Sequence, residues 1–309
     1  KFSEIQTDQS KRLGYFMDWD NSYHTSSDEN NYAIWNFLKI VNEKGWLYKG
    51  RDSVPWCPRC GTAISQHEIL TEEYKEITHR TVVFKLKVKG RDNEYLLAWT
   101  TTPWTIPGNV ALAVDENLSY WKMTNGKEFV YLINPSASGD LQKEDLLVTK
   151  MGLTEGWKKV EELKGKDLIG IEYKAPYDDL FHVKQVLKGY VHRVVAADPL
   201  ILPINPAEGT GIVHVAPGAG GEDFKLGKKE KLPVIGEIDE AGIFIDGFDF
   251  ISGEHVKKAS DLILEDLNKR NLIHKDFDYL HRYPTCWRCK TELVWRVVDE
   301  WYIAMDKPS

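Results

Sequence analysis

The chain has 309 residues, of which 42% are hydrophobic and 28% charged, and its net charge is −7. This composition predicts a globular protein of about two domains and excludes a disordered chain, a collagen and a coiled coil. No run approaches the ~18 consecutive apolar residues of a membrane-spanning helix, so no membrane partner is expected. The acidic balance argues against a protein that coats nucleic acid, although it allows a basic face on an acidic body.

The ends of the sequence are those expected of a fragment. It starts at Lys1 without Met or a signal peptide, and it stops just after the apolar, aromatic run at 301–305. We therefore expect a piece of a longer polypeptide.

The first 50 residues have a helical pattern. Ser26 and Glu29 form a predicted capping box, and apolar residues then recur at helical spacing up to Gly45. Alternating residues at 81–88 predict the first strand of a β-rich body. Further strands are expected at 95–101, 110–114, 129–133, 146–149, 191–195 and 211–215. Helices are expected from about Glu222 and over 254–271.

The four cysteines form two Cys-x-x-Cys pairs, Cys57 with Cys60 and Cys286 with Cys289, inside a repeated Cys-x-Arg-Cys-x-Thr pattern. Each tight turn brings two sulfurs together, and two such pairs complete the tetrahedral thiolate site of one structural Zn²⁺ ion. Most of the chain lies between the pairs, so it must leave and return at one place, as a domain inserted on a zinc-pinned stalk does. A redox motif and unliganded thiols are the alternatives.

Two further segments carry candidate chemistry. The segment 99–109 is rich in threonine, and its prolines predict an extended path after a strand. The segment 209–224 predicts a strand ending near His214, a Gly-rich loop and a helix with Glu222 and Asp223 in its first turn. Simpler explanations exist, because threonine favours strands and acidic residues favour a helix N-terminus. A phosphate-binding loop is disfavoured by the missing Lys-Ser/Thr.

With both Cys pairs in place, these segments resemble the editing domain of isoleucyl-tRNA synthetases. The resemblance rests on Trp99-Thr-Thr-Thr-Pro-Trp-Thr105 and on Gly209-Thr-Gly-Ile-Val-His214-x-Ala-Pro217, and it extends over nearly the whole chain. Valyl and leucyl relatives usually carry Thr-Thr-Arg-Pro where this chain has Thr101-Thr102-Pro103, which favours the isoleucyl family over these alternatives. The His-x-Gly-His and Lys-Met-Ser-Lys-Ser signatures of the ATP-dependent site are missing, so no ligase activity is expected from this chain alone.

The resemblance implies an α+β fold, a β-barrel-centred editing domain with surrounding helices, inserted on a zinc-ribbon stalk. We expect a helical segment at 1–50, the first half of the stalk at 51–75, the editing domain at 76–280, and the second half with a return strand at 281–309. A cytoplasmic monomer is expected.

The implied reaction is hydrolysis of valine from mischarged isoleucine tRNA, with valyl-adenylate as a second candidate substrate. A synthetic pocket rejects an amino acid one methylene smaller by only ~1–3 kcal/mol, so a second, smaller sieve multiplies the discrimination. Water is the expected nucleophile, because the sequence shows no Ser-His-Asp or Cys-His array.

The resemblance also implies roles for individual residues. Asp223 would bind the substrate α-ammonium, and His214, with its side chain over the cavity mouth, would bind the ribose or close the pocket. Trp104 and Asn109 would contact the substrate. The hydroxyls that would bind the ester, the ribose and a water belong to Thr100, Thr101, Thr102 and Thr105.

Two rival classes remain. A zinc-stapled tRNA-binding module without catalysis would use a basic surface made by Lys184, Lys188, Arg193 and the clusters at 225–231 and 269–275, although solvated faces explain these residues equally well. A redox protein would use the Cys-x-x-Cys pairs.

Overall fold

A computed structural model describes residues 2–70, 74–138, 149–153 and 156–307. The chain divides into two compact units, one made of 1–51 with 299–309 and a larger one made of 52–298. Among the described helices, none is both long and apolar enough to cross a membrane.

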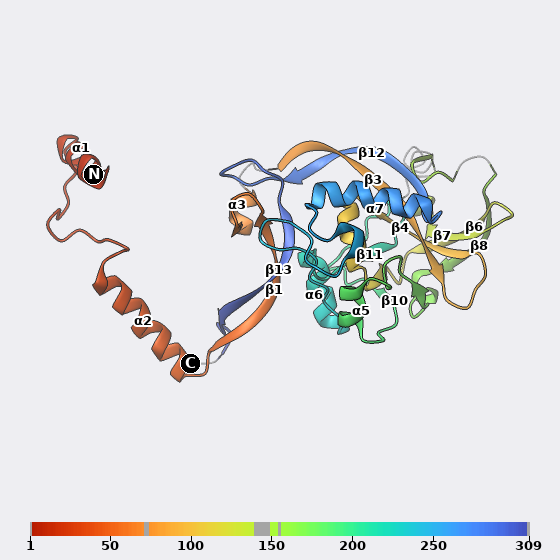
Figure 1. Cartoon of the computed structure of the whole chain (residues 1–309), viewed down its shortest axis with the longest axis horizontal. Coiled ribbons are helices and arrows are strands. Elements are labelled where there is room, and N and C mark those ends of the chain that lie inside the picture. Colours follow the sequence, from red (N-terminus) through yellow and green to blue (C-terminus); the bar gives the residue numbers. More distant parts are fainter. Residues whose placement is uncertain (1, 71–73, 139–148, 154–155, 308–309) are drawn as a thin grey trace. The chain divides into compact units, whose positions relative to one another are not determined.

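The smaller unit contains α1 (Phe2–Arg12) and α2 (Asp28–Glu43) (Figure 1). Ser27, not Ser26, caps α2: its extended backbone lets its hydroxyl accept from the Asn30 amide at 3.3 Å. The predicted capping box was therefore wrong by one residue. Of the apolar face predicted for this helix, only Val41 is buried.

The larger unit is built on an open, curled sheet of ten strands. Its strands are β3 (Tyr74–Val88), β4 (Glu94–Thr100), β5 (Ala111–Val114), β6 (Ser119–Thr124), β7 (Phe129–Ile133), β8 (Lys158–Lys164), β9 (Tyr173–Lys174), β10 (Arg193–Ala196), β11 (Val213–Val215) and β12 (Ile273–Pro284).

The sheet forks at β4, where β7 and β11 pair with successive parts of the same strand edge. The order is β10-β5-β11-β4-β7-β6-β8, while β3 pairs antiparallel with the other edge of β4 and also holds β12 and β9. β7 runs parallel to the first half of β4, and β11 runs parallel to its end. The expected barrel is thus a half-barrel among the described strands, and the mixed α+β class is confirmed.

The expected strands correspond to β3, β4, β5, β7, β10 and β11, whereas the one expected at 146–149 lies almost wholly outside the described residues. Sequence analysis missed β6, β8 and β12. β8 is almost wholly exposed, and charged residues interrupt the apolar pattern of β6 and β12, so none of the three shows the clear alternation that marks a half-buried strand.

Helices pack against the curled sheet and carry the expected apolar stripe. In α7 (Val256–Lys269), Ala259, Ile263 and Leu267 are fully buried, as predicted. The predicted helix near Glu222 is α6 (Gly221–Glu230), and α5 (Phe181–Leu187) was missed. The remaining short helices are α3 (Gln66–Leu70), η1 (Pro103–Gly108), η2 (Pro135–Ser138), η3 (Gly165–Asp167) and η4 (Asp249–Ile251).

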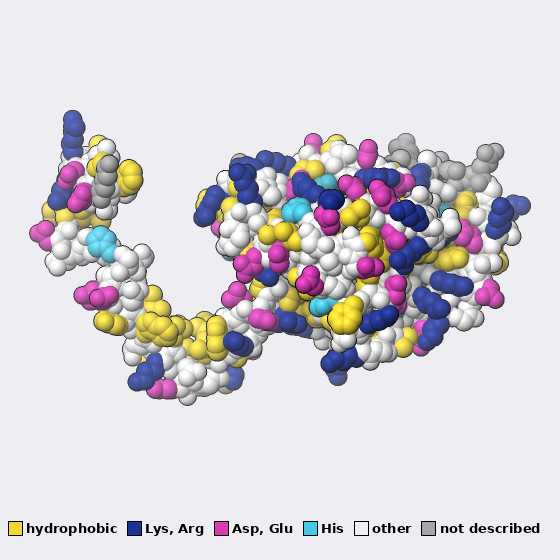
Figure 2. Space-filling view, viewed as in Figure 1, with side chains coloured by type: hydrophobic (Ala, Val, Ile, Leu, Met, Phe, Trp, Pro, Cys, Tyr) yellow, Lys and Arg dark blue, Asp and Glu magenta, His cyan; other side chains and the backbone are white. Residues whose placement is uncertain are grey.

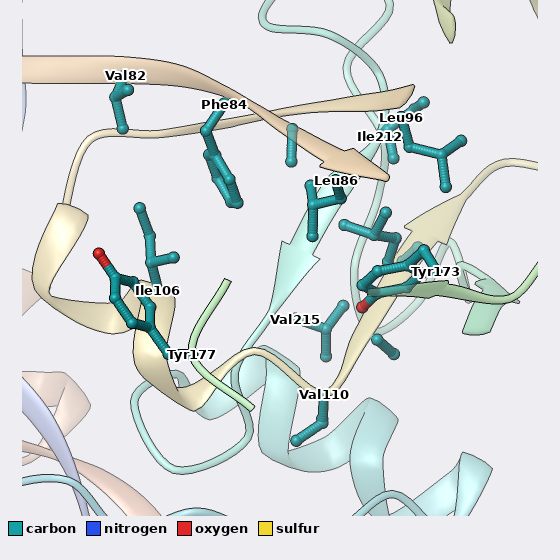
Figure 3. Packing of buried hydrophobic residues seen from close by; sticks show 14 of the residues in the cluster. Val82, Phe84, Leu86, Leu96, Ile106, Val110, Tyr173, Tyr177, Ile212 and Val215 are labelled. Carbon is teal, nitrogen blue, oxygen red and sulfur yellow. The ribbon is translucent and has the colours of Figure 1, made fainter. Parts of the chain in front are cut away.

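The main core lies inside the curl. Figure 3 shows Phe84 and Leu86 of β3 pointing toward Ile106 of η1 and Val215 of β11, and all four are at most 1% exposed. Burying one such side chain contributes about 1.5–3 kcal/mol. This packing fixes η1 and β11, which carry the candidate site.

A separate three-stranded sheet, in the order β13-β1-β2, contains the cysteine segments. Its strands are β1 (Leu47–Cys57), β2 (Thr62–Ala63) and β13 (Val294–Ile303). Ile64, Ile69 and Leu293 form a small apolar cluster with the cysteines, distinct from the main core.

Candidate functional site

The Thr-rich segment is helical where an extended path was expected. After β4, residues Pro103–Gly108 form the 3₁₀ helix η1. Proline suits the first position of a helix, because its φ is already fixed and the missing amide would have no partner there. The extended preference that a proline imposes on the preceding residue holds at Thr102, which has φ −127° and ψ 75°, whereas Ile106, before Pro107, lies inside η1. The expectation of an extended segment was therefore wrong beyond Thr102.

Parallel pairing of β4 with β11 brings the two candidate segments together. Val213 pairs with Trp99, so Thr100 and His214 lie at neighbouring strand ends. Gly209, just before β11, has φ +70°, and a Cβ there would lie 2.6 Å from the Trp99 ring. The glycine therefore permits both the left-handed turn and the close approach of the two segments.

His214 is held in one orientation by a buried chain of hydrogen bonds. The Tyr173 hydroxyl donates to Asn109 Oδ1 at 2.7 Å. This turns Asn109 Nδ2 toward His214 Nδ1, also at 2.7 Å, so Nδ1 accepts. His214 Nε2 then carries the proton and faces the Thr105 carbonyl at 3.2 Å and the Thr105 hydroxyl at 3.1 Å.

This environment keeps His214 neutral. Burial lowers the pKa of its imidazole to about 4, because the charged form would lose its hydration. The side chain is 7% exposed and packs edge-on against Phe84. The expectation that it lies over the cavity mouth was wrong, since the Asn109 and Thr105 bonds draw the ring into the interior.

Two of the threonine hydroxyls are committed within the segment. The Thr100 hydroxyl accepts from the Thr102 amide at 3.1 Å and lies 3.3 Å from the Thr102 hydroxyl. The Thr105 hydroxyl donates to the Thr102 carbonyl at 3.0 Å. Within the described residues the Thr101 hydroxyl has no hydrogen-bond partner, so it can bind a ligand.

Thr101, Thr102 and Trp104 line a cavity of about 320 Å³. Its other walls come from β3, the start of α7, the end of β12 and residues 291–294. Their polar members are Thr78, His79, Arg80, His255, Lys257, Ser260, Asp261, Tyr283, Thr291 and Glu292.

Asp223 lies in the first turn of α6 and is not among the residues lining this cavity. Its Oδ2 accepts from the Ala216 amide at 2.8 Å, just beyond the end of β11. Burial raises the pKa of the Asp223 carboxyl to about 7, with a smaller contribution from the nearby Glu222 charge. The side chain is half-buried, so a ligand can reach it. A cation bound there would favour the ionised form.

Sequence analysis missed Tyr173 and Glu237. Tyr173 belongs to a two-residue strand with no apolar alternation to mark it. Glu237 is 2% exposed and neither of its carboxyl oxygens has a hydrogen-bond partner in the described structure. A Cβ on Gly108 would lie 2.5 Å from Glu237 Oε1, so glycine at 108 is explained by the approach of this carboxyl to the end of η1.

The structure brings the two cysteine pairs together, as predicted. The sulfurs of Cys57, Cys60, Cys286 and Cys289 all lie within 4.8 Å of one another. Cys57 Sγ and Cys289 Sγ are 3.4 Å apart, near the about 3.8 Å edge of a tetrahedral site with Zn–S bonds of ~2.3 Å. The Cys60 amide also donates to Cys57 Sγ at 3.3 Å. Four thiolates in this arrangement fit a structural Zn²⁺ ion and leave no open position.

Comparison with known proteins defines the class. The family model of tRNA synthetases class I (I, L, M and V) matches residues 1–308. The chain belongs to this family.

Among its relatives are isoleucine–tRNA ligases. That of Clostridium novyi is 39% identical over 99% of this chain and 27% of the relative. That of Pyrococcus furiosus is 40% identical over 98% of this chain and 28% of the relative. The chain therefore spans little more than a quarter of their length.

A solved P. knowlesi cytosolic leucyl-tRNA synthetase editing domain aligns with 67% of this chain and 98% of its own, at 10% identity and a TM-score of 0.46.

Removing the metal should loosen the cysteine segments and leave the main core folded, because the two apolar clusters are separate. We expect about one zinc equivalent per purified chain, and Cys60→Ser should bind less. Hydrogen exchange should then rise at 57–64 and 285–293 and stay low in β4 and β11. Arg59→Gln, an exposed position between the two cysteines of the first pair, is the control. Metal-free protein with both segments protected would contradict this prediction.

Glu237→Gln should flatten the dependence of stability on pH. Burial raises the pKa of Glu237 well above its usual value, so its protonated form is the one compatible with folding. Wild-type stability should fall as pH rises above about 4.5, by up to about 1.4 kcal/mol per pH unit. The glutamine variant should lack this loss. Urea unfolding between pH 5 and 8 measures it, with exposed Glu240→Gln as the control; parallel curves for wild type and Glu237→Gln would refute the assignment.

Proposed function

We propose that this chain is an editing hydrolase of isoleucyl-tRNA synthetase, which removes valine from mischarged isoleucine tRNA. The observation that carries the proposal is the shared edge of β4 and β11. There Thr100–Thr102, His214 and the backbone that binds Asp223 are neighbours. The isoleucine–tRNA ligase relatives support the amino acid assigned.

In the proposed reaction, water attacks the ester carbonyl carbon. The bond from that carbon to the ribose oxygen breaks, the ribose takes a proton, and free valine leaves. Asp223 holds the α-ammonium, and the free Thr101 hydroxyl binds the ester or the water. Catalysis is then mainly a matter of orientation, which can supply several kcal/mol.

His214 acts in this proposal through position. Both ring nitrogens of His214 are engaged in hydrogen bonds and the ring stays neutral. It therefore holds Thr105 and Asn109 in position behind the Thr-rich segment that lines the cavity. Thr100 and Thr105 likewise set the shape of the segment, while Thr102 and Trp104 form the wall that excludes the larger side chain. Asn109 is a positioning residue.

The partners follow from the proposal. They are isoleucine tRNA carrying valine and, as a second substrate, valyl-adenylate. In the same proposal the protein acts as a monomer in the cytoplasm. Zinc, when bound by the four cysteines, supplies structural cross-linking alone. A zinc-stapled tRNA-binding module would bind the same RNA without turnover, so hydrolysis separates the two functions.

Asp223→Asn should slow hydrolysis of valyl-tRNA by about 10- to 150-fold, the effect of losing a charged hydrogen bond of ~1.5–3 kcal/mol. Because the carboxylate must be ionised, wild-type kcat/KM should rise from pH 6 to 7 more steeply than that of the variant. Glu222→Gln, in the same helical turn but exposed, is the control: it should keep the activity, and by removing a nearby negative charge it should lower the pKa of Asp223 and move the rise in kcat/KM to lower pH. Equal losses in both variants would remove the ammonium-binding role from Asp223.

Thr102→Ala should relax the discrimination against isoleucine. The substitution enlarges the cavity beside Trp104, so that the larger side chain of an isoleucyl ester can enter it. One methylene of clash corresponds to ~1–3 kcal/mol, so the ratio of valyl- to isoleucyl-tRNA hydrolysis should fall by about 5- to 150-fold.

Ser260→Ala, at a cavity-lining residue of α7, serves as the control for that measurement. If Thr102→Ala slows both substrates in proportion, Thr102 serves catalysis or folding, and the sieve lies elsewhere.

A further inference from the structure

A group of exposed lysines follows α5 and α6 on the surface of the larger unit. Within the described residues, none of those named here forms an ion pair. They are Lys184, Lys188, Lys225, Lys228 and Lys231. Figure 2 shows Lys and Arg side chains along the lower edge of this unit, where Figure 1 places these two helices. On a chain with a net charge of −7, so many unpaired cations in one region need a reason.

Arg193 shows that the C-terminal ends of the two helices meet. Its guanidinium donates to the Tyr190 hydroxyl, three residues beyond the end of α5, at 3.4 Å. It also donates to the carbonyl of Glu230, the last residue of α6, at 3.4 Å. The lysines of both helix ends therefore belong to one surface.

Both helices end in a lysine with left-handed backbone. Lys188 has φ 46° and Lys231 has φ 56°, at positions where glycine is the usual residue. A lysine strains the backbone there, whereas glycine does not. Cations favour a helix C-terminus, but lysines inside the helices can supply that charge without strain. The same costly choice at two adjacent ends indicates a requirement for charge outside the helices.

The surface is also connected with the candidate site. Helix α6 carries Asp223 in its first turn and Lys231 at its end, about 12 Å further along the axis. Lys225, Lys228 and Lys229 share one face of the helix at i, i+3 and i+4. Lys229 pairs with Asp198 at 2.7 Å, and the other two have no anionic partner in the described chain.

We propose that the exposed ends of α5 and α6, with Lys188, Arg193 and Lys231 at their centre, bind the phosphate backbone of the RNA whose 3′ end enters the site. This proposal rests on the proposed function for the identity of the RNA. The surface binds phosphates without reading sequence, because lysines act as point charges toward a polyanion. Association is therefore strongly dependent on salt.

The test uses a double variant, Lys188→Gly with Lys231→Gly, which removes two charges and relieves strain together. Its thermal unfolding midpoint should equal or exceed that of the wild type. Its affinity for a hairpin RNA with a short single-stranded 3′ end should fall, and the slope of log K against log salt should become shallower by about 1.4–1.8. Between 50 and 200 mM salt the double variant should lose about tenfold less affinity than the wild type.

Two matched controls isolate the effect. Asn271→Gly relieves the same left-handed strain (φ 55°) after α7 without removing a charge. Lys127→Gln removes one exposed charge at the β6–β7 turn. Both should keep the wild-type slope. If the double variant melts below the wild type, Lys188→Gln with Lys231→Gln provides the same charge test.

An unchanged slope in the double variant would overturn the proposal. It would also be overturned if Lys127→Gln lowered the slope as much per charge, or if the double variant lost affinity for phosphatidylserine vesicles and kept its affinity for RNA. Hydrolysis of valyl-adenosine, which has no phosphate backbone, should be the same in wild type and double variant. If the wild type hydrolyses neither valyl-adenosine nor valyl-tRNA, the proposed function fails. The dependence of RNA affinity on salt still tests whether this surface binds RNA.

Discussion

The parallel pairing of β4 with β11 is the constraint on which the candidate site depends. It joins two segments more than a hundred residues apart and aligns their ends, so that the Thr-rich segment leaves one strand where the Gly-rich loop leaves the next. The pairing needs Gly209 under the Trp99 ring and Gly211, with φ +67°, against Ile133. A side chain at either glycine would separate the strands and move His214 away from Thr105 and Asn109.

Sequence analysis found the residues of the site better than their arrangement. The threonines, His214 and Asp223 could be identified because they lie in two short segments with unusual composition. The conformation of η1 could not, because Pro103 is compatible with an extended strand and with the first turn of a helix. The choice between them is made by Ile106, which is 1% exposed and packs into the main core. Tertiary burial thus decided a local conformation that the sequence left open.

The residues that hold the site in place, Tyr173 and Glu237, could not be predicted from the sequence, again because tertiary contacts define their role. Tyr173 and Glu237 come from segments without any pattern of their own, and their importance arises only from contact with Asn109 and Gly108. The cysteines are the opposite case. A Cys-x-x-Cys turn is a local signal, and its repetition was enough to predict that the distant pairs meet, as they do.

The ionisable groups around η1 and β11 share one electrostatic property. Burial keeps His214 neutral and Glu237 protonated, and it leaves Asp223 only partly ionised near neutral pH. Each group avoids charge because the surrounding protein offers no counter-ion. In the proposed function, the arriving α-ammonium is that counter-ion: it stabilises the Asp223 carboxylate and displaces its proton. Where the carboxyl is protonated, binding therefore exchanges its proton for the positive charge of the ammonium.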